Sequence, residues 1–124
     1  MELSREVTQA NVVRAWEPGR VRIGDEWLHG HLIVAADRIV SGWPVTAADR
    51  IDFAALEPAI ALEPEIILLG TGPDLVLPDV ELMARLAAEA IGLEIMSTAA
   101  ACRTYNVLVH ERRRVVAALF NPEP

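Results

Sequence analysis

The segment from Glu65 to Gly72 (Glu-Ile-Ile-Leu-Leu-Gly-Thr-Gly) contains four consecutive large aliphatic residues, followed by two glycines that flank a threonine. Four aliphatic side chains in a row leave no polar face, which is typical of a central strand buried on both sides in a parallel or mixed sheet. The glycines permit a tight turn at the carboxyl end of this strand. The other segments of the chain can therefore be placed around one buried strand.

The part of the chain that follows Gly72 predicts helix, strand, helix and strand in succession. The first helix is expected to open at Pro78-Asp79 and to end with Gly92 as its left-handed residue. Its apolar side is made of Leu82, Met83, Leu86, Ala87, Ala90 and Ile91. Three further elements follow, namely a strand at residues 93–96, a helix from Ser97-Thr98 to about Glu111, and an apolar strand at residues 115–120.

The part before the buried strand is rich in strand patterns joined by turns. Strands are expected at residues 11–16, 21–28, 29–34 and 39–40, with turns at 17–20, 24–25 and 37–38. Asp52 is a suitable N-cap for a short helix over residues 53–60, which Pro58 would kink or end early. Helix and strand alternation is thus confined to the second half.

The strand at Glu65 and the strand at Leu93 are expected to be parallel neighbours or near neighbours, because a right-handed crossover joins them. Their carboxyl ends would then meet at one edge of the sheet, where open α/β sheets usually bind ligands. The start of the following helix favours an anion there. The candidate ligand-binding residues are Gly70, Thr71, Gly72, Ser97, Thr98, Arg103 and Asn106.

Each of these motifs also has a purely structural interpretation. Gly-Thr-Gly lacks the third glycine of a dinucleotide fingerprint and the Gly-Lys-Ser/Thr of a P-loop, so a tight turn explains it as well. Arg103, Asn106 and His110 recur at helical spacing and are typical of a solvated face. Cys102 lies among alanines, as a packing residue does. No catalytic set can be assembled from these residues.

Metal and cofactor sites are not indicated. His29 and His31 would share one face of a strand, but no third ligand is near them in sequence. A single cysteine excludes an intramolecular disulfide and thiolate-rich metal sites, and it fits a reducing compartment. We therefore expect no cofactor and no metal.

Length and charge limit the classes of partner. The chain has 124 residues, of which 52% are hydrophobic, and this predicts one domain with an ordinary core. Its formal net charge of -7 disfavours nucleic acid and anionic membrane surfaces as partners. The acidic start at residues 1–6 lacks an apolar signal region, and no apolar run is long enough for a membrane span. A cytoplasmic protein without membrane insertion is expected.

Three segments carry a family resemblance, namely Ile67 to Gly72, Gly92 to Thr98 and Ala100 to Asn106. Together with Leu28 to Val34 and Trp43-Pro44, they resemble the small uncharacterised prokaryotic proteins related to mitochondrial respiratory complex I assembly factor 3. Members of this family commonly have an acid, threonine and glycine where this chain has Ser97-Thr98-Ala99. A role for a carboxylate at that position is therefore in doubt.

The resemblance implies a three-layer α/β domain with a central mixed sheet, helices on one face, and a β-hairpin plus helix on the other. It implies no catalytic activity, since the mitochondrial relative works by binding other proteins. The leading hypothesis is a non-catalytic interaction protein whose partner is a protein, and a homo-oligomer remains open. Trp43 and Tyr105 are the candidate exposed anchors, with the alternative that both are core residues, Tyr105 above all. The alternative is a small-molecule or anion-binding protein or enzyme that uses the crevice at Gly70–Gly72.

Overall fold

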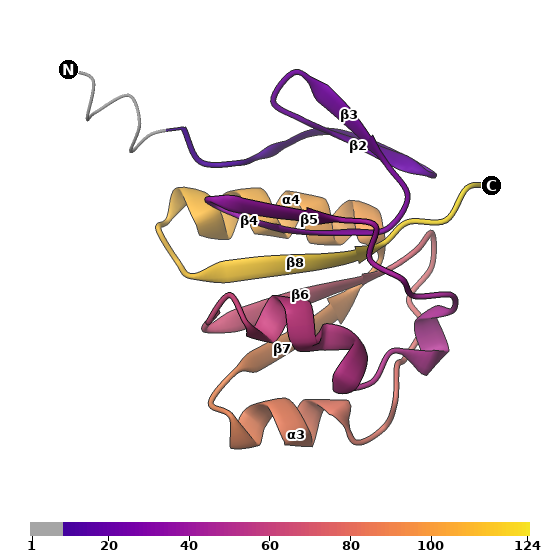
Figure 1. The fold of residues 1–124 in the computed structure, drawn as a ribbon, viewed down its shortest axis with the longest axis vertical. Helices are drawn as coiled ribbons and strands as arrows, with labels where there is room; N and C mark the ends of the chain where they lie inside the picture. The colour runs from indigo at the N-terminus through magenta and orange to yellow at the C-terminus, as the bar shows by residue number, and fades with distance from the viewer. Residues whose placement is uncertain (1–8) are drawn as a thin grey trace.

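The central sheet of the computed structural model, which describes residues 9–124, contains five strands in the order β5-β4-β8-β6-β7 (Figure 1). The expected central strand is β6, and its parallel neighbours are β7 and β8. β4 pairs antiparallel with β8 and with the edge strand β5. The bounds are Leu32–Ala35 for β4, Arg38–Ser41 for β5, Ile66–Thr71 for β6, Gly92–Met96 for β7 and Val115–Phe120 for β8. The predicted parallel arrangement of β6 and β7 is confirmed.

Short helices cover one face of this sheet. They are the 3-10 helices η1 (Ala48–Arg50) and η2 (Ala54–Leu56), and the α-helices α2 (Glu57–Ile60) and α3 (Leu82–Ala88). Leu56, Leu82 and Leu86 point from these helices into a core that includes Ile67 and Leu69 of β6. The alternate residue of β6, Leu68, belongs to the core on the other face. Both faces of β6 are thus buried, as its unbroken apolar run predicts.

A second sheet and the longest helix cover the opposite face. The sheet is antiparallel and contains β1 (Val13–Glu17), β2 (Arg20–Ile23) and β3 (Glu26–His29), and the helix is α4 (Thr98–His110). Val13, Val21 and Ile23 of the small sheet pack in the same core as Ala101, Cys102, Tyr105 and Val109 of α4. The three-layer α/β arrangement with a mixed central sheet is confirmed, and the hairpin has a third strand.

Two helix boundaries differ from the prediction. α3 begins at Leu82 because Asp79 to Leu82 form a turn, closed by a hydrogen bond from the Leu82 N–H to the Asp79 carbonyl at 3.1 Å. The Asp79 carboxylate also accepts a hydrogen bond from the Glu81 N–H at 3.3 Å. The left-handed residue after α3 is Ala90, with φ 61°, and Gly92 already belongs to β7, so the expected role of Gly92 was wrong. The Ile91 N–H donates to the Leu86 carbonyl, which completes the helix end without a glycine.

The start of the sequence at residues 1–6, on which the absence of a signal region was judged, lies outside the described residues. Within residues 9–124, none of the helices has both the length and the apolar character that a membrane span requires.

Candidate functional site

The carboxyl edge predicted as a ligand site brings Gly70, Thr71 and Gly72 of β6 next to Ser97 and Thr98 at the start of α4. The Thr98 side chain is fully buried. Its hydroxyl accepts a hydrogen bond from the Gly72 N–H at 2.8 Å and donates to the Phe120 carbonyl at 2.6 Å. The Thr98 N–H donates to the Gly72 carbonyl at 2.9 Å. Thr98 therefore joins the ends of β6 and β8 to α4.

These contacts use backbone N–H groups at the start of α4 that an anion would otherwise bind. Of the first three N–H groups of α4, that of Thr98 bonds to Gly72, and that of Ala100 bonds to the Ser97 hydroxyl at 3.3 Å. Gly70 packs tightly against α4, because a Cβ built on it would lie 2.9 Å from the Thr98 Cα. Gly70, Gly72 and Thr98 therefore come together as predicted, and in this structure they contact one another. A cavity of about 110 Å³ lies beside them, lined by Pro73 and residues 121–124 among others.

Arg103 and Asn106 lie further along α4, facing β1. Asn106 accepts a hydrogen bond from the Val13 N–H and donates to the Val13 carbonyl, both at 2.8 Å, so it fastens β1 onto α4. Arg103 is exposed and lines a shallow cavity of about 270 Å³ with Asn106, Ala99 and residues of β1. The structure does not bring Arg103 into one site with Gly70–Gly72.

The two aromatic residues expected as exposed docking anchors are both buried. Trp43 is only 3% exposed, packs in the core under the short helices, and donates from its indole Nε1 to the Ala55 carbonyl at 2.8 Å. Tyr105 is fully buried, and its hydroxyl donates to the Asn11 carbonyl at 2.7 Å. The structure contradicts the exposed-anchor interpretation and agrees with the alternative that both are core residues. Each polar group, the indole N–H and the phenol O–H, has a hydrogen-bond partner inside the protein, as buried Trp and Tyr usually have.

The thiol and imidazole groups also have structural partners. Burial raises the pKa of the Cys102 thiol to about 12, although the nearby Arg103 charge opposes the shift, so the reactive thiolate is suppressed. Burial lowers the pKa of His31, whose neutral Nδ1 accepts a hydrogen bond from the Asn121 N–H at 2.8 Å. Among residues 9–124, no group of three or more His, Cys, Asp and Glu side chains is arranged to hold a metal ion.

The connection between β6 and α3 exposes a cluster of apolar side chains that the sequence did not single out. Its residues, with their exposed fractions, are Leu75 (62%), Leu77 (69%), Val80 (91%) and Met83 (52%). We call this cluster the β6–α3 surface. Met83 was expected on the buried side of its helix, but α3 buries only Leu82 and Leu86. The four residues lie between positions 75 and 83 of the chain. Exposed apolar side chains concentrated in one segment are typical of interaction sites in folded proteins.

Hydrogen bonds hold the backbone that carries the β6–α3 surface. The Thr71 hydroxyl donates to the Asp74 carbonyl at 2.6 Å and accepts from the Val76 N–H at 3.0 Å. Further along, the Asp79 N–H donates to the Ile51 carbonyl at 3.1 Å, which ties the segment to the end of η1. The backbone is therefore fixed at three points while the apolar side chains face outward.

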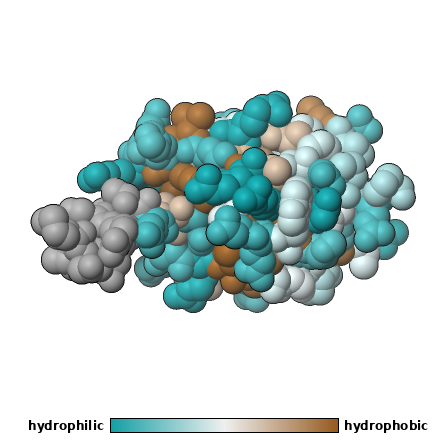
Figure 2. Space-filling view, turned by 90° about the horizontal axis from the view of Figure 1, so that it is seen from above, coloured by the Kyte–Doolittle hydropathy of each residue, from teal (hydrophilic) through white to brown (hydrophobic). Residues whose placement is uncertain are grey.

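The face over β2 and β3 has a different character. Figure 2 shows this face as largely hydrophilic, with small hydrophobic patches separated by polar side chains. In Figure 1 it lies at the end of the molecule opposite α3. The exposed apolar side chains of the β6–α3 surface thus have no counterpart in the part of the face over β2 and β3 that Figure 2 shows.

Comparisons with known proteins point to one family over almost all of the described chain. A family model described as "Protein of unknown function (DUF498/DUF598)" matches residues 13–120. The "13 kDa major membrane protein" of Francisella tularensis subsp. holarctica is 33% identical over 118 residues, which cover 93% of this chain and 95% of that protein. The "NADH dehydrogenase [ubiquinone] 1 alpha subcomplex assembly factor 3" of Danio rerio is 29% identical over 122 residues, covering 97% of this chain and 70% of that protein.

The same relationship appears in the fold. The crystal structure of a protein from Bordetella parapertussis superposes with a TM-score of 0.84 at 36% sequence identity. The superposition covers 92% of this chain and 98% of the Bordetella chain. The arrangement of layers is therefore shared with that protein over nearly its whole length.

Proposed function

The chain belongs to the DUF498/DUF598 family of proteins of unknown function, and from this premise we propose that it is a single-domain, non-catalytic module that binds a protein partner. One observation carries the proposal, namely the exposure of the four apolar side chains of the β6–α3 surface. The printed name of the Danio rerio relative, an assembly factor, supports the same class of function. The contacts of Gly70 and Gly72 with Thr98 favour this class over ligand binding at that edge.

The charges around the β6–α3 surface indicate the chemistry of the partner. Asp74, Asp79 and Glu81 lie between or beside its apolar residues, and all three are exposed. The stretch from Pro73 to Ala84 contains no Arg, so this part of the chain is both apolar and acidic. A protein segment that offers apolar side chains surrounded by basic ones would complement it, since opposite charges speed encounter and fix the docking register.

A cytoplasmic location is part of the proposal. It rests on the single cysteine, which is typical of proteins from reducing compartments. The Francisella relative is named a membrane protein. A partner that is itself bound to a membrane would account for both observations.

The double variant Leu77→Asp with Val80→Asp tests this surface. Both side chains are largely exposed, so the melting temperature should change little. Interface anchors typically contribute more than about 1 kcal/mol each, so removing two should weaken partner binding by roughly 30-fold. The measurement is the yield of co-purifying proteins when the tagged chain is captured from its native cells, compared between wild type and variant by quantitative mass spectrometry.

Val107→Asp is the matched control, because Val107 is 56% exposed but lies on α4, away from the β6–α3 surface. It should recover the same partner at the wild-type yield. If the double variant keeps the wild-type yield, or if Val107→Asp loses the partner equally, the β6–α3 surface is not the docking site.

A further inference from the structure

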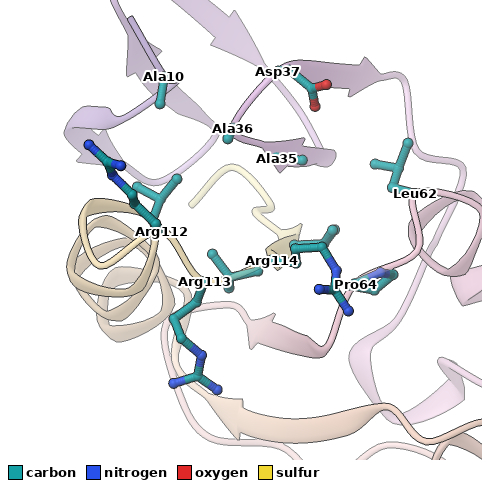
Figure 3. Close-up of a pocket in the computed structure, with 12 residues that line it drawn as sticks. Ala10, Ala35, Ala36, Asp37, Leu62, Pro64, Arg112, Arg113 and Arg114 are labelled. Atoms are coloured by element: carbon teal, nitrogen blue, oxygen red, sulfur yellow. The ribbon is translucent and has the colours of Figure 1, made fainter. Parts of the chain in front are cut away.

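A cavity of about 500 Å³ opens at the end of the sheet opposite the Gly70–Gly72 edge (Figure 3). It lies at the amino-terminal ends of β6 and β8 and at the turn between α4 and β8. Its size falls in the range of pockets that bind small molecules. The lining residues are mostly apolar or basic, with buried Pro64, Val109, Val115 and Val116 inside and Arg112, Arg113 and Arg114 at the opening.

The three arginines are not equivalent. The Arg113 Nε donates to the Glu65 carboxylate at 3.1 Å. The pKa of Glu65 is held below its usual value by the hydrogen bond from the Arg114 backbone N–H and by the hydrogen bond from the Arg113 side chain. Arg114 donates from Nε to the Glu63 carbonyl at 3.3 Å, and its charge has only a minor effect on the pKa of Glu65. No acidic side chain within residues 9–124 forms an ion pair with Arg112 or Arg114.

Figure 3 shows where Arg112 and Arg114 lie. Arg112 extends on the side of Ala10, and Arg114 lies beside Pro64. Asp37, at the turn after β4, is the acidic residue that lines the same cavity. Within the described residues 9–124, the cavity therefore combines an apolar interior with the guanidinium groups of Arg112 and Arg114 and the carboxylate of Asp37.

Arg112 also occupies an unfavourable backbone conformation. Its φ of 64° is left-handed, a region in which glycine is strongly preferred at a helix end. The Arg112 N–H donates to the Val109 carbonyl and the Arg113 N–H donates to the Leu108 carbonyl, both at 3.0 Å, so the position is the left-handed residue of a Schellman motif. Arg112 thus lowers the stability of the folded chain relative to a glycine at the same position, and it provides a long cationic side chain there.

We propose that this cavity binds a small organic carboxylate with a short aliphatic chain. The aliphatic chain would pack against Val109, Val115 and Val116, and the carboxylate would accept hydrogen bonds from Arg114 beside Pro64. Arg112, on the Ala10 side, would add positive charge to the opening. Asp37 on the rim, together with the nearby Glu65, opposes a doubly charged group, which favours a carboxylate over a phosphate. This site is independent of the β6–α3 surface, which lies on a different segment of the chain.

Titration of the isotope-labelled protein with octanoate, octanol and inorganic phosphate, followed by NMR, tests the proposal. Octanoate should shift the amide signals of Ala35, Ala36 and Val115, with a dissociation constant on the order of millimolar for so small a ligand. Octanol should bind at least about tenfold more weakly, because it cannot form charge-assisted hydrogen bonds. Equal binding of octanol, or shifts with phosphate as strong as with octanoate, would overturn it.

Three variants separate binding from folding. Arg112→Gly should raise the melting temperature, because glycine tolerates the left-handed conformation, and it should also weaken octanoate binding several-fold. Arg114→Gln should weaken binding as well, whereas Arg103→Gln, on the other cavity, should bind like wild type. Unchanged octanoate binding by Arg112→Gly and Arg114→Gln, or an equal loss in Arg103→Gln, would contradict the assignment.

Discussion

Gly70→Val is expected to lower the free energy of unfolding by more than about 3 kcal/mol, at the upper end of what overpacking costs. Gly70 lies in β6 with no space above its Cα, because a Cβ there would be 2.9 Å from both the Cα and the Oγ1 of Thr98 and 3.2 Å from Leu119 Cδ2. Real Cβ atoms do not approach backbone this closely, so α4 would have to move away from the sheet. Urea unfolding monitored by circular dichroism measures the change.

Gly92→Val is the matched control for this substitution. Gly92 also lies in a strand of the same sheet, but a Cβ there would find its nearest neighbour, the Glu65 carbonyl oxygen, at an ordinary 3.7 Å. Its unfolding free energy should stay within about 1 kcal/mol of wild type, because valine suits a strand. If both variants unfold at the wild-type urea concentration, the close contact between β6 and α4 does not limit the fold.

Trp43→Ala is expected to cost about 3–5 kcal/mol, the range for removing a large buried aromatic side chain. The indole fills the core between the sheet and the short helices, and its loss would also leave the Ala55 carbonyl without its hydrogen bond. With a total stability of about 5–15 kcal/mol for a protein of this size, such a variant would be partly unfolded in mild denaturant. Guanidinium unfolding curves give the value directly.

Trp27→Ala provides the comparison, since Trp27 is only partly buried on β3 and its ring lies under the Arg20 guanidinium at 4.0 Å. An exposed cation–π pair contributes only about 0.5–1 kcal/mol, so this variant should remain close to wild type. A Trp43→Ala protein that melts like wild type yet loses its protein partner would return Trp43 to the role of a docking anchor and contradict the packing seen in the core.

Several features of the fold were predictable because a single local pattern determines them. The apolar runs around Leu68 and Val116 are typical of strands buried on both faces, and both lie in the centre of the sheet. The Ser97 hydroxyl caps α4 as expected from its place before a helical pattern. The resemblance to the assembly factor family supplied the three-layer arrangement, which local patterns alone do not determine.

Other features depend on distant contacts and could not be read from the sequence. Whether Trp43 is a core residue or a surface anchor depends on η2, which lies 12 residues away. Met83 is three residues before Leu86 and so has helical spacing with it, but Met83 is 52% exposed while Leu86 is buried. From the sequence, the run Arg112 to Arg114 predicts only a turn. The cavity beside it could not be predicted, because residues from the end of β4 and from the segment at Pro64, far away in sequence, form its other walls. These tertiary contacts decide which polar and apolar residues are available for binding.

The claim that the β6–α3 surface docks a protein is tested most directly by photo-crosslinking in the native cell. Val80 is 91% exposed and can be replaced by p-benzoylphenylalanine without disturbing the core, and Val107 serves as the control position. The account predicts that light will join a second, different protein to the chain from position 80 and not from position 107. No crosslink from position 80, the same crosslink from both positions, or a product made only of two copies of this chain would contradict it.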